Sequence, residues 1–89
     1  MDPLVDAGEC LLVPERVIVA PAVGIFRPAD TVGEAPGEAI SEGQAIGVVE
    51  GPGSSTPVRS PFRGHLMGMM AGAGDRVREG QALAWLRIA

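Results

Sequence analysis

The sequence contains no lysine, because all seven of its positively charged residues are arginine. It therefore has no side-chain amine that could condense with a carboxylic acid to form an amide. Aromatic residues are also scarce, with two Phe, one Trp and no Tyr among 89 residues. Together with a net charge of −4, this scarcity excludes the basic, base-stacking surface typical of nucleic-acid binding.

Three further absences bound the class of protein. The single Cys10 has no partner for an internal disulfide. No stretch approaches the roughly 20 consecutive apolar residues of a membrane helix. The acidic start Met1-Asp2-Pro3 also lacks the features of a signal peptide. These features predict a cytoplasmic protein that does not associate with membranes.

The remaining composition indicates a single small domain made of short strands. The chain is 46% apolar but carries 13 glycines and 8 prolines, so it is ordered yet too often interrupted for long helices. We expect strands at residues 16–20 and 24–26 and an exposed polar loop at residues 27–36. Residues 1–15 form a loose arm in this interpretation, and residues 16–89 form the domain.

An internal repeat organises the second half of the chain. Residues 37–49 match residues 74–86 at a constant offset of 37 (74 − 37), including Glu-Gly-Gln-Ala in both copies, and Pro21 to Gly24 is echoed by Pro61 to Gly64 at an offset of 40 (61 − 21). Copies this short cannot each bury an apolar face, so they must pair. The repeat predicts two antiparallel sheets packed face to face with pseudo-twofold symmetry. Turns with positive φ are expected at four glycines, namely Gly37, Gly43, Gly74 and Gly80.

The joint between the copies is predicted to be a β-hairpin. Val48, Val49 and Val58 flank a cluster of Gly, Pro and Ser residues, which is the pattern of two strands joined by a tight turn. Two serine hydroxyls and free backbone N–H groups in such a turn can hold an anion. An inert turn that merely closes the fold is an equally good interpretation of these residues.

The chain resembles the biotinyl/lipoyl carrier-domain family, and especially the biotin carboxyl carrier proteins of acyl-CoA carboxylases. Residues 64–83 follow the family pattern of Gly-x-Val, an aliphatic strand, Gly-Asp-x-Val and Gly-Gln-x-Leu. Residues 20–26 resemble the Pro-Met-Val-Gly-Thr-Phe opening of carboxylase carriers. The resemblance covers about residues 17–88 and implies an all-β flattened barrel or sandwich of two four-stranded antiparallel sheets.

The same resemblance implies that the cofactor attachment residue is missing. The family hairpin bears Glu-Ala-Met-Lys-Met, whose lysine is joined to biotin. Counting back from Gly64 without a gap places Glu50 on the family Glu and Gly53 on the lysine. Pro52 and Ser54 stand in place of the flanking Met residues. We therefore expect neither biotin nor lipoate on this chain, and no other cofactor.

These observations favour a non-biotinylated accessory or assembly module that binds a carboxylase-type or other biosynthetic enzyme. The residues expected to bind the partner are Gly51, Pro52, Gly53, Ser54, Ser55, Arg59 and Arg63. The alternative is a small-molecule or anion-binding protein, or an atypical catalyst, that uses a pocket between the 51–55 hairpin and the 27–36 loop. Exposed strand edges leave a homodimer open.

Three other features carry weaker hypotheses. His65, Met67 and Met69 alternate, so on a strand they would share one face and offer soft ligands to Cu(I), although ordinary packing by Met is the favoured interpretation. Trp85 is expected in the core, since burying it would give so small a domain a large apolar contact; an exposed Trp85 would instead indicate an interface. A single His and scattered acids provide no Ser/His/Asp set, which argues against an enzyme.

Overall fold

The computed structural model describes residues 15–33, 35 and 37–88. Within these residues the chain forms strands and no helix. The described part of the chain therefore contains no helix that could cross a membrane. The strands are β1 (Glu15–Val19), β2 (Gly24–Pro28), β3 (Ala39–Ile40), β4 (Ala45–Gly51), β5 (Ser54–Arg59), β6 (Gly64–Met69), β7 (Arg76–Val77) and β8 (Ala82–Ile88). Residues 1–14 of the expected arm lie outside the described residues, and Glu15, which was assigned to the arm, begins β1.

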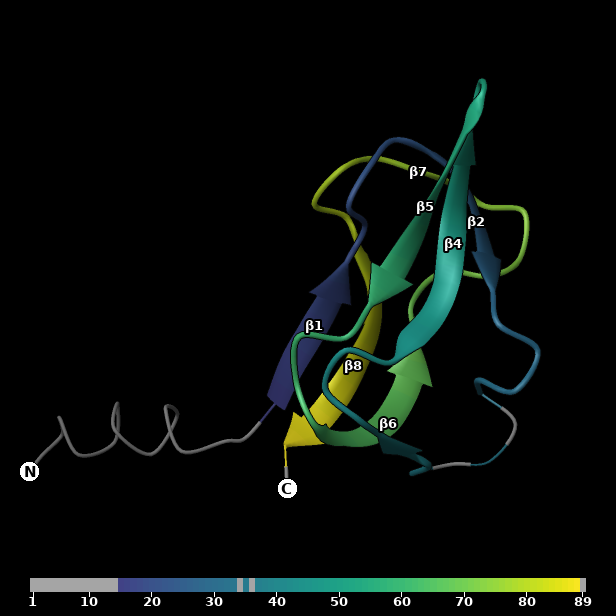
Figure 1. Cartoon of the computed structure of the whole chain (residues 1–89). Coiled ribbons are helices and arrows are strands. Elements are labelled where there is room, and N and C mark those ends of the chain that lie inside the picture. The colour runs from purple at the N-terminus through teal and green to yellow at the C-terminus, as the bar shows by residue number, and fades with distance from the viewer. Residues whose placement is uncertain (1–14, 34, 36, 89) are drawn as a thin grey trace, which may run out of the picture.

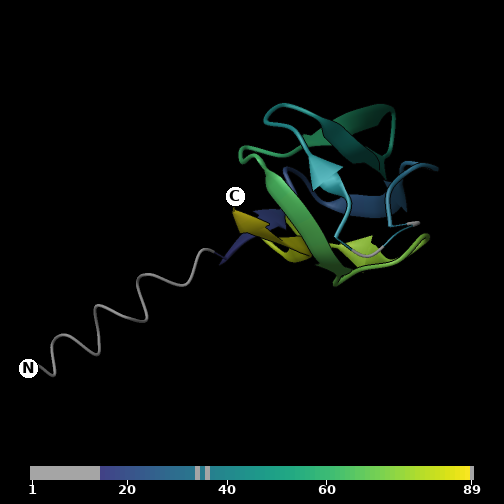
Figure 2. The same ribbon diagram turned by 90° about the horizontal axis from the view of Figure 1, so that it is seen from below.

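The strands form two four-stranded antiparallel sheets, which confirms the predicted fold. One sheet has the order β1-β8-β6-β3 and the other has the order β5-β4-β2-β7. The sheets form two layers, as the two orthogonal views show (Figures 1 and 2). A single cluster of buried side chains from both sheets fills the space between them: Ile18, Phe26, Ile40, Ile46, Val49, Val58, Leu66, Val77, Leu83 and Leu86, with Ala20, Ala71 and Ala84.

The two halves of the chain interlock, because each sheet contains two strands from each half. The offset of 37 carries β3 onto β7 (39 + 37 = 76) and β4 onto β8 (45 + 37 = 82). The offset of 40 carries β2 onto β6 (24 + 40 = 64) and β1 onto β5 (19 + 40 = 59). This mapping converts the order of one sheet into the order of the other. Neither half could form either sheet alone, as the length of the repeat predicted.

A β-bulge at the same place in each copy changes which residues face the core. The pairing skips Ile46 on β4 and Leu83 on β8, and the offset of 37 relates these two residues (83 − 46). After the bulge, Ala84 is also buried and Trp85 turns to the outer face of its sheet, where it is only partly buried. The prediction that Trp85 lies in the core is therefore wrong, because an extra strand residue shifts the alternation.

The expected 27–36 loop begins later than predicted. Arg27 and Pro28 belong to β2, where they pair with Val48 and Gly47 of β4. On its other side β2 pairs with β7 only at Gly24 and Ile25. Pro28 can thus occupy the strand end, because no neighbouring strand there requires its missing N–H.

Glycine is required at two kinds of position. Gly43 and Gly80 occupy equivalent turns with φ of +85° and +86°, a backbone conformation that other residues adopt only at a cost; Gly37 and Gly74 also have positive φ, as expected. Gly64 has a different constraint. A Cβ atom on it would overlap the carbonyl oxygen of Arg87 and lie 3.1 Å from the Cα atom of Ile88, so the backbone of β8 occupies the space of a side chain.

The substitution Gly64→Ala should lower the free energy of unfolding by roughly 2–3 kcal/mol, because backbone atoms must move to admit one methyl group. Gly72→Ala is the matched control, since a Cβ there meets nothing nearer than 3.8 Å and its φ is not positive. We expect the control to change stability by less than about 0.5 kcal/mol. Urea unfolding of both variants measures the difference, and equal stabilities would contradict the close approach.

Candidate functional hairpin

The β4–β5 hairpin ends in a two-residue turn that projects beyond the other strands (Figure 1). Gly51 pairs with Ser54, so Pro52 and Gly53 alone form the turn. Proline followed by glycine at φ +70° is the arrangement of a type II turn, in which proline presets the first φ and glycine adopts the second. The sequence therefore builds a defined, protruding tip at the predicted hairpin.

The tip is exposed and chemically plain. Pro52, Gly53, Ser54 and Ser55 are all exposed, and a Cβ atom on Gly53 would meet nothing within 4 Å. A side chain at this position would thus extend freely into solvent, but glycine has none. The reactive groups that the tip does offer are two hydroxyls and the peptide N–H groups.

Glu50, directly before the tip, is held by an ion pair with Arg27 of the adjacent strand. The Arg27 Nε atom donates to Glu50 Oε1 at 2.6 Å. Both side chains are about half exposed, so water screens the pair and its contribution to stability is at most about 1 kcal/mol. The contact orients Glu50 along the outer surface of the sheet.

The structure does not bring Arg59 and Arg63 to the tip. Arg59 pairs with Ala45 at the opposite end of the hairpin, five residues or about 17 Å along β5 from Ser54. Its guanidinium donates to the Gly43 carbonyl at 3.0 Å. Arg63 immediately precedes β6 and lines a separate hollow with Arg16 and residues 61 and 62. The predicted partner-binding set therefore divides into a tip, residues 51–55, and a distant basic pair.

An open hollow of about 460 Å³ lies beside the tip, but it is not the pocket that the sequence suggested. Its lining comprises Val23, Gly24, Ile25, Glu50, Gly51, Pro52 and Arg76. None of the described residues of the 27–36 loop lines it. Residues 27–30 line another hollow with Ala45, Gly47 and Val48. Sequence reasoning missed Arg76, the cation of this site. Following the repeat could have found it, because β7 pairs with the start of β2, which neighbours Glu50.

The proposed soft-metal set does not share a face. A bulge in β6 leaves Met67 without a partner, since Leu66 pairs with Leu86 and Gly68 with Trp85. His65 and Met67 are exposed, whereas Met69 packs against the core cluster. The alternation on which the Cu(I) hypothesis depended is thus interrupted.

The interlocked sheets and the projecting hairpin define a carrier-type β-sandwich. A family model described as biotin-requiring enzyme, the biotin/lipoyl family, matches residues 16–86. The chain therefore belongs to the biotinyl/lipoyl domain family. No curated protein sequence matches it.

Solved structures show the same fold at low identity. Urea carboxylase of Kluyveromyces lactis aligns with a TM-score of 0.67 and 19% identity over 81% of this chain and 6% of its own. A single-chain, multi-domain long-chain acyl-CoA carboxylase aligns with a TM-score of 0.72 and 16% identity over 85% of this chain and 7% of its own. A putative succinylglutamate desuccinylase/aspartoacylase family protein of Shewanella amazonensis aligns with a TM-score of 0.65 and 19% identity over 83% of this chain and 20% of its own. The chain thus spans a small fraction of each of these proteins.

The correspondence between Gly53 and the attachment lysine of the family can be tested by restoring the family motif. Gly51→Ala, Pro52→Met, Gly53→Lys and Ser54→Met together place Ala-Met-Lys-Met after Glu50. We expect a biotin protein ligase to attach one biotinyl group to this variant, because the lysine would stand free at an exposed tip. Intact mass spectrometry measures the modification.

The controls for this experiment are the wild-type chain and the same variant with Arg instead of Lys at position 53. Neither offers an amine at the tip, so neither should gain mass. If the variant with the four substitutions folds but stays unmodified, this hairpin does not correspond to the family's attachment hairpin.

Proposed function

We propose that the chain is an unmodified carrier-type module that binds a carboxylase-type or other biosynthetic enzyme through the tip, residues 51–55. The observation that carries this proposal is the tip itself, which keeps a defined turn and exposes residues 52–55 but has Gly53 at its end. A chain without lysine has no side-chain amine that could hold biotin or lipoate in amide linkage. Binding is therefore the function that remains for this hairpin.

The comparisons support an enzyme as the partner. The matching family is described by its biotin-requiring enzymes, and two proteins of the same fold are carboxylases. The fold also occurs in a protein described as a desuccinylase/aspartoacylase family member. The same proposal places the chain in the cytoplasm, where Cys10 would remain reduced.

A second candidate function is the binding of a small anionic metabolite in the hollow beside the tip. The observation in its favour is Arg76, which lines the hollow together with the apolar Val23, Ile25 and Pro52. Glu50 also lines it, but its carboxylate is paired with Arg27. This combination suits a molecule with a carboxylate or phosphate and an apolar body. A ligand-dependent rise in melting temperature, lost in Arg76→Ala, would distinguish it from enzyme binding.

The enzyme-binding proposal predicts that the native host yields a carboxylase or acyl-transfer subunit when the wild-type chain is used as bait. Direct titration of that purified subunit should then show binding weakened about tenfold or more by Ser54→Asp plus Ser55→Asp, since two charges are placed at the contact. The tip residues are exposed, so this variant should keep its fold.

Arg59→Ala plus Arg63→Ala is the control, because these residues lie away from the tip. We expect it to change the affinity by less than about twofold. The proposal is wrong if the wild-type chain recovers no such subunit, and the tip is not the binding site if only the arginine variant loses affinity.

A further inference from the structure

One sheet carries an apolar outer face. Among the described residues, five large hydrophobic side chains are exposed, and four of them lie on or beside the outer side of the β1-β8-β6-β3 sheet: Val17 (45%), Val19 (44%), Met67 (38%) and Met70 (56%). The partly buried Trp85 lies among them, since it pairs with Val17 on one side and Gly68 on the other. We call the side chains of Val17, Val19, Met67, Met70 and Trp85 the apolar face.

The internal repeat provides a control for this face, because the other sheet has the same architecture. Val17, Val19 and Trp85 correspond to Pro57, Arg59 and Val48 (17 + 40, 19 + 40 and 85 − 37). The bulge in β6 leaves Met67 without a counterpart and shifts the offset to 41, so Met70 corresponds to Ala29 (70 − 41), and both donate to equivalent carbonyls, of Leu83 and Ile46. Of these four counterparts, one is charged, one is a proline on an edge strand, one is alanine and only Val48 is a large hydrophobic residue. The fold therefore does not require large hydrophobic residues at most of these positions, so the apolar face has another cause.

The apolar face is hollowed rather than flat. A Cβ atom on Gly68 would lie 2.8 Å from Nε1 of Trp85, so the indole ring lies over this glycine. Beside it is an open hollow of about 510 Å³ lined by Glu15, Arg16, Val17, Met70 and Trp85. The surface can thus receive apolar side chains from a chain that passes across it.

The size of the apolar face favours a short segment over a folded domain. Its residues occupy three strands about 4.8 Å apart over about five residues of 3.3 Å each, which is roughly 240 Å². A stable complex of two folded proteins buries about 800 Å² on each partner. The apolar face alone is too small for that, but it matches a few extended residues.

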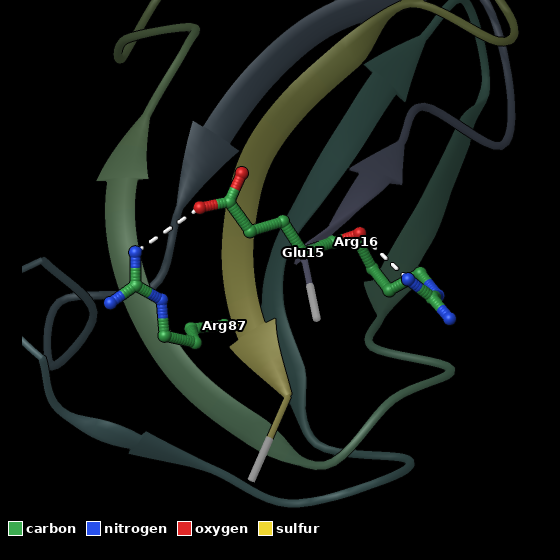
Figure 3. Close-up of polar contacts among 3 residues, drawn as sticks. All are labelled: Glu15, Arg16 and Arg87. Atoms are coloured by element: carbon green, nitrogen blue, oxygen red, sulfur yellow. Dashed lines mark hydrogen bonds and ion pairs between the residues drawn. The ribbon is translucent and has the colours of Figure 1, made fainter. Parts of the chain in front are cut away.

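A suitable segment enters the domain at this face. The run Cys10-Leu11-Leu12-Val13 ends two residues before Glu15, which lines the hollow. Glu15 is fixed there by its pairing with Arg87 and by the ion pair between Glu15 Oε2 and Arg87 Nη2 at 3.2 Å (Figure 3). Pro14 cannot donate to a strand ladder, so the run is poorly suited to extend β1 along the sheet edge.

We propose that residues 10–13 fold back at Pro14 and cover the apolar face. The distance permits it: the run lies two to five residues, or about 7–17 Å, from Glu15. Trp85 lies two positions along β1 and one strand across, or about 8 Å from Glu15. The inference does not depend on the proposed enzyme partner.

Two residues make the contact measurable, because the chain has a single tryptophan, on the apolar face, and a single cysteine, in the arm. In the full chain Trp85 should be shielded from quenching by acrylamide. The gain from burying the run and the cost of ordering it are of similar size, so Leu11→Ser plus Leu12→Ser should release the arm. Quenching then rises, and the emission maximum shifts to longer wavelength.

Leu4→Ser plus Val5→Ser is the matched control, since it removes the same kind of side chain from the arm outside the run; it should leave both signals unchanged. Energy transfer gives an independent measurement. An acceptor dye attached at Ala7→Cys, in a Cys10→Ser background, should receive energy from Trp85 efficiently while Leu11 and Leu12 are intact. Most of this transfer should be lost when Leu11→Ser plus Leu12→Ser is added to the same background.

Two results would overturn the proposal. One is quenching that is equal in all variants together with weak energy transfer, which would show that the arm leaves the apolar face uncovered. The other is shielding of Trp85 that increases with protein concentration alongside a doubled molecular mass. In that case a second copy of the chain, and not its arm, would cover the apolar face.

Discussion

The fold depends on a close backbone approach that is made twice. Gly24 and Gly64 are related by the offset of 40, and a Cβ atom on either would overlap a carbonyl oxygen, of Glu50 and of Arg87 respectively; these partners are themselves related by the offset of 37. Each contact joins the two central strands of one sheet, β2 with β4 and β6 with β8. Since these central pairs carry most of the core, glycine at both positions lets two short repeats enclose it.

The sequence predicted the features that depend on spacing and turn chemistry. The repeat identified the pairing of the two halves, and the Gly/Pro/Ser cluster identified the hairpin, because glycine and proline restrict the backbone locally. It did not predict the bulges at Leu83 and Met67. A bulge arises from how two strands fit each other, so simple alternation placed Met69 on the face of His65 and Met67, and the burial expected of Trp85 from its size took no account of a shift within β8.

The candidate site shows the same division between local and long-range information. The exposed turn at Pro52 and Gly53 follows from local sequence, whereas the neighbours of the tip are set by pairing between distant strands. Arg59 is near the tip in sequence but lies at the far end of the strand, about 17 Å away. Arg76 is distant in sequence, yet β7 brings it beside Glu50 through the start of β2.

A symmetric scaffold separates what folding requires from what function adds. Positions that both copies share, such as Gly43 and Gly80 or Ile46 and Leu83, serve the backbone and the core. The two sheets differ on their outer faces, where Pro57, Arg59 and Ala29 of one correspond to Val17, Val19 and Met70 of the other. Under the pseudo-twofold relation, the end of β8 is the counterpart of the end of β4 that leads into the tip (51 + 37 = 88). Glu15 pairs with Arg87 at that end, so the arm joins the domain opposite the hairpin. An enzyme bound at the tip and an arm covering the apolar face would therefore use different surfaces of one small domain.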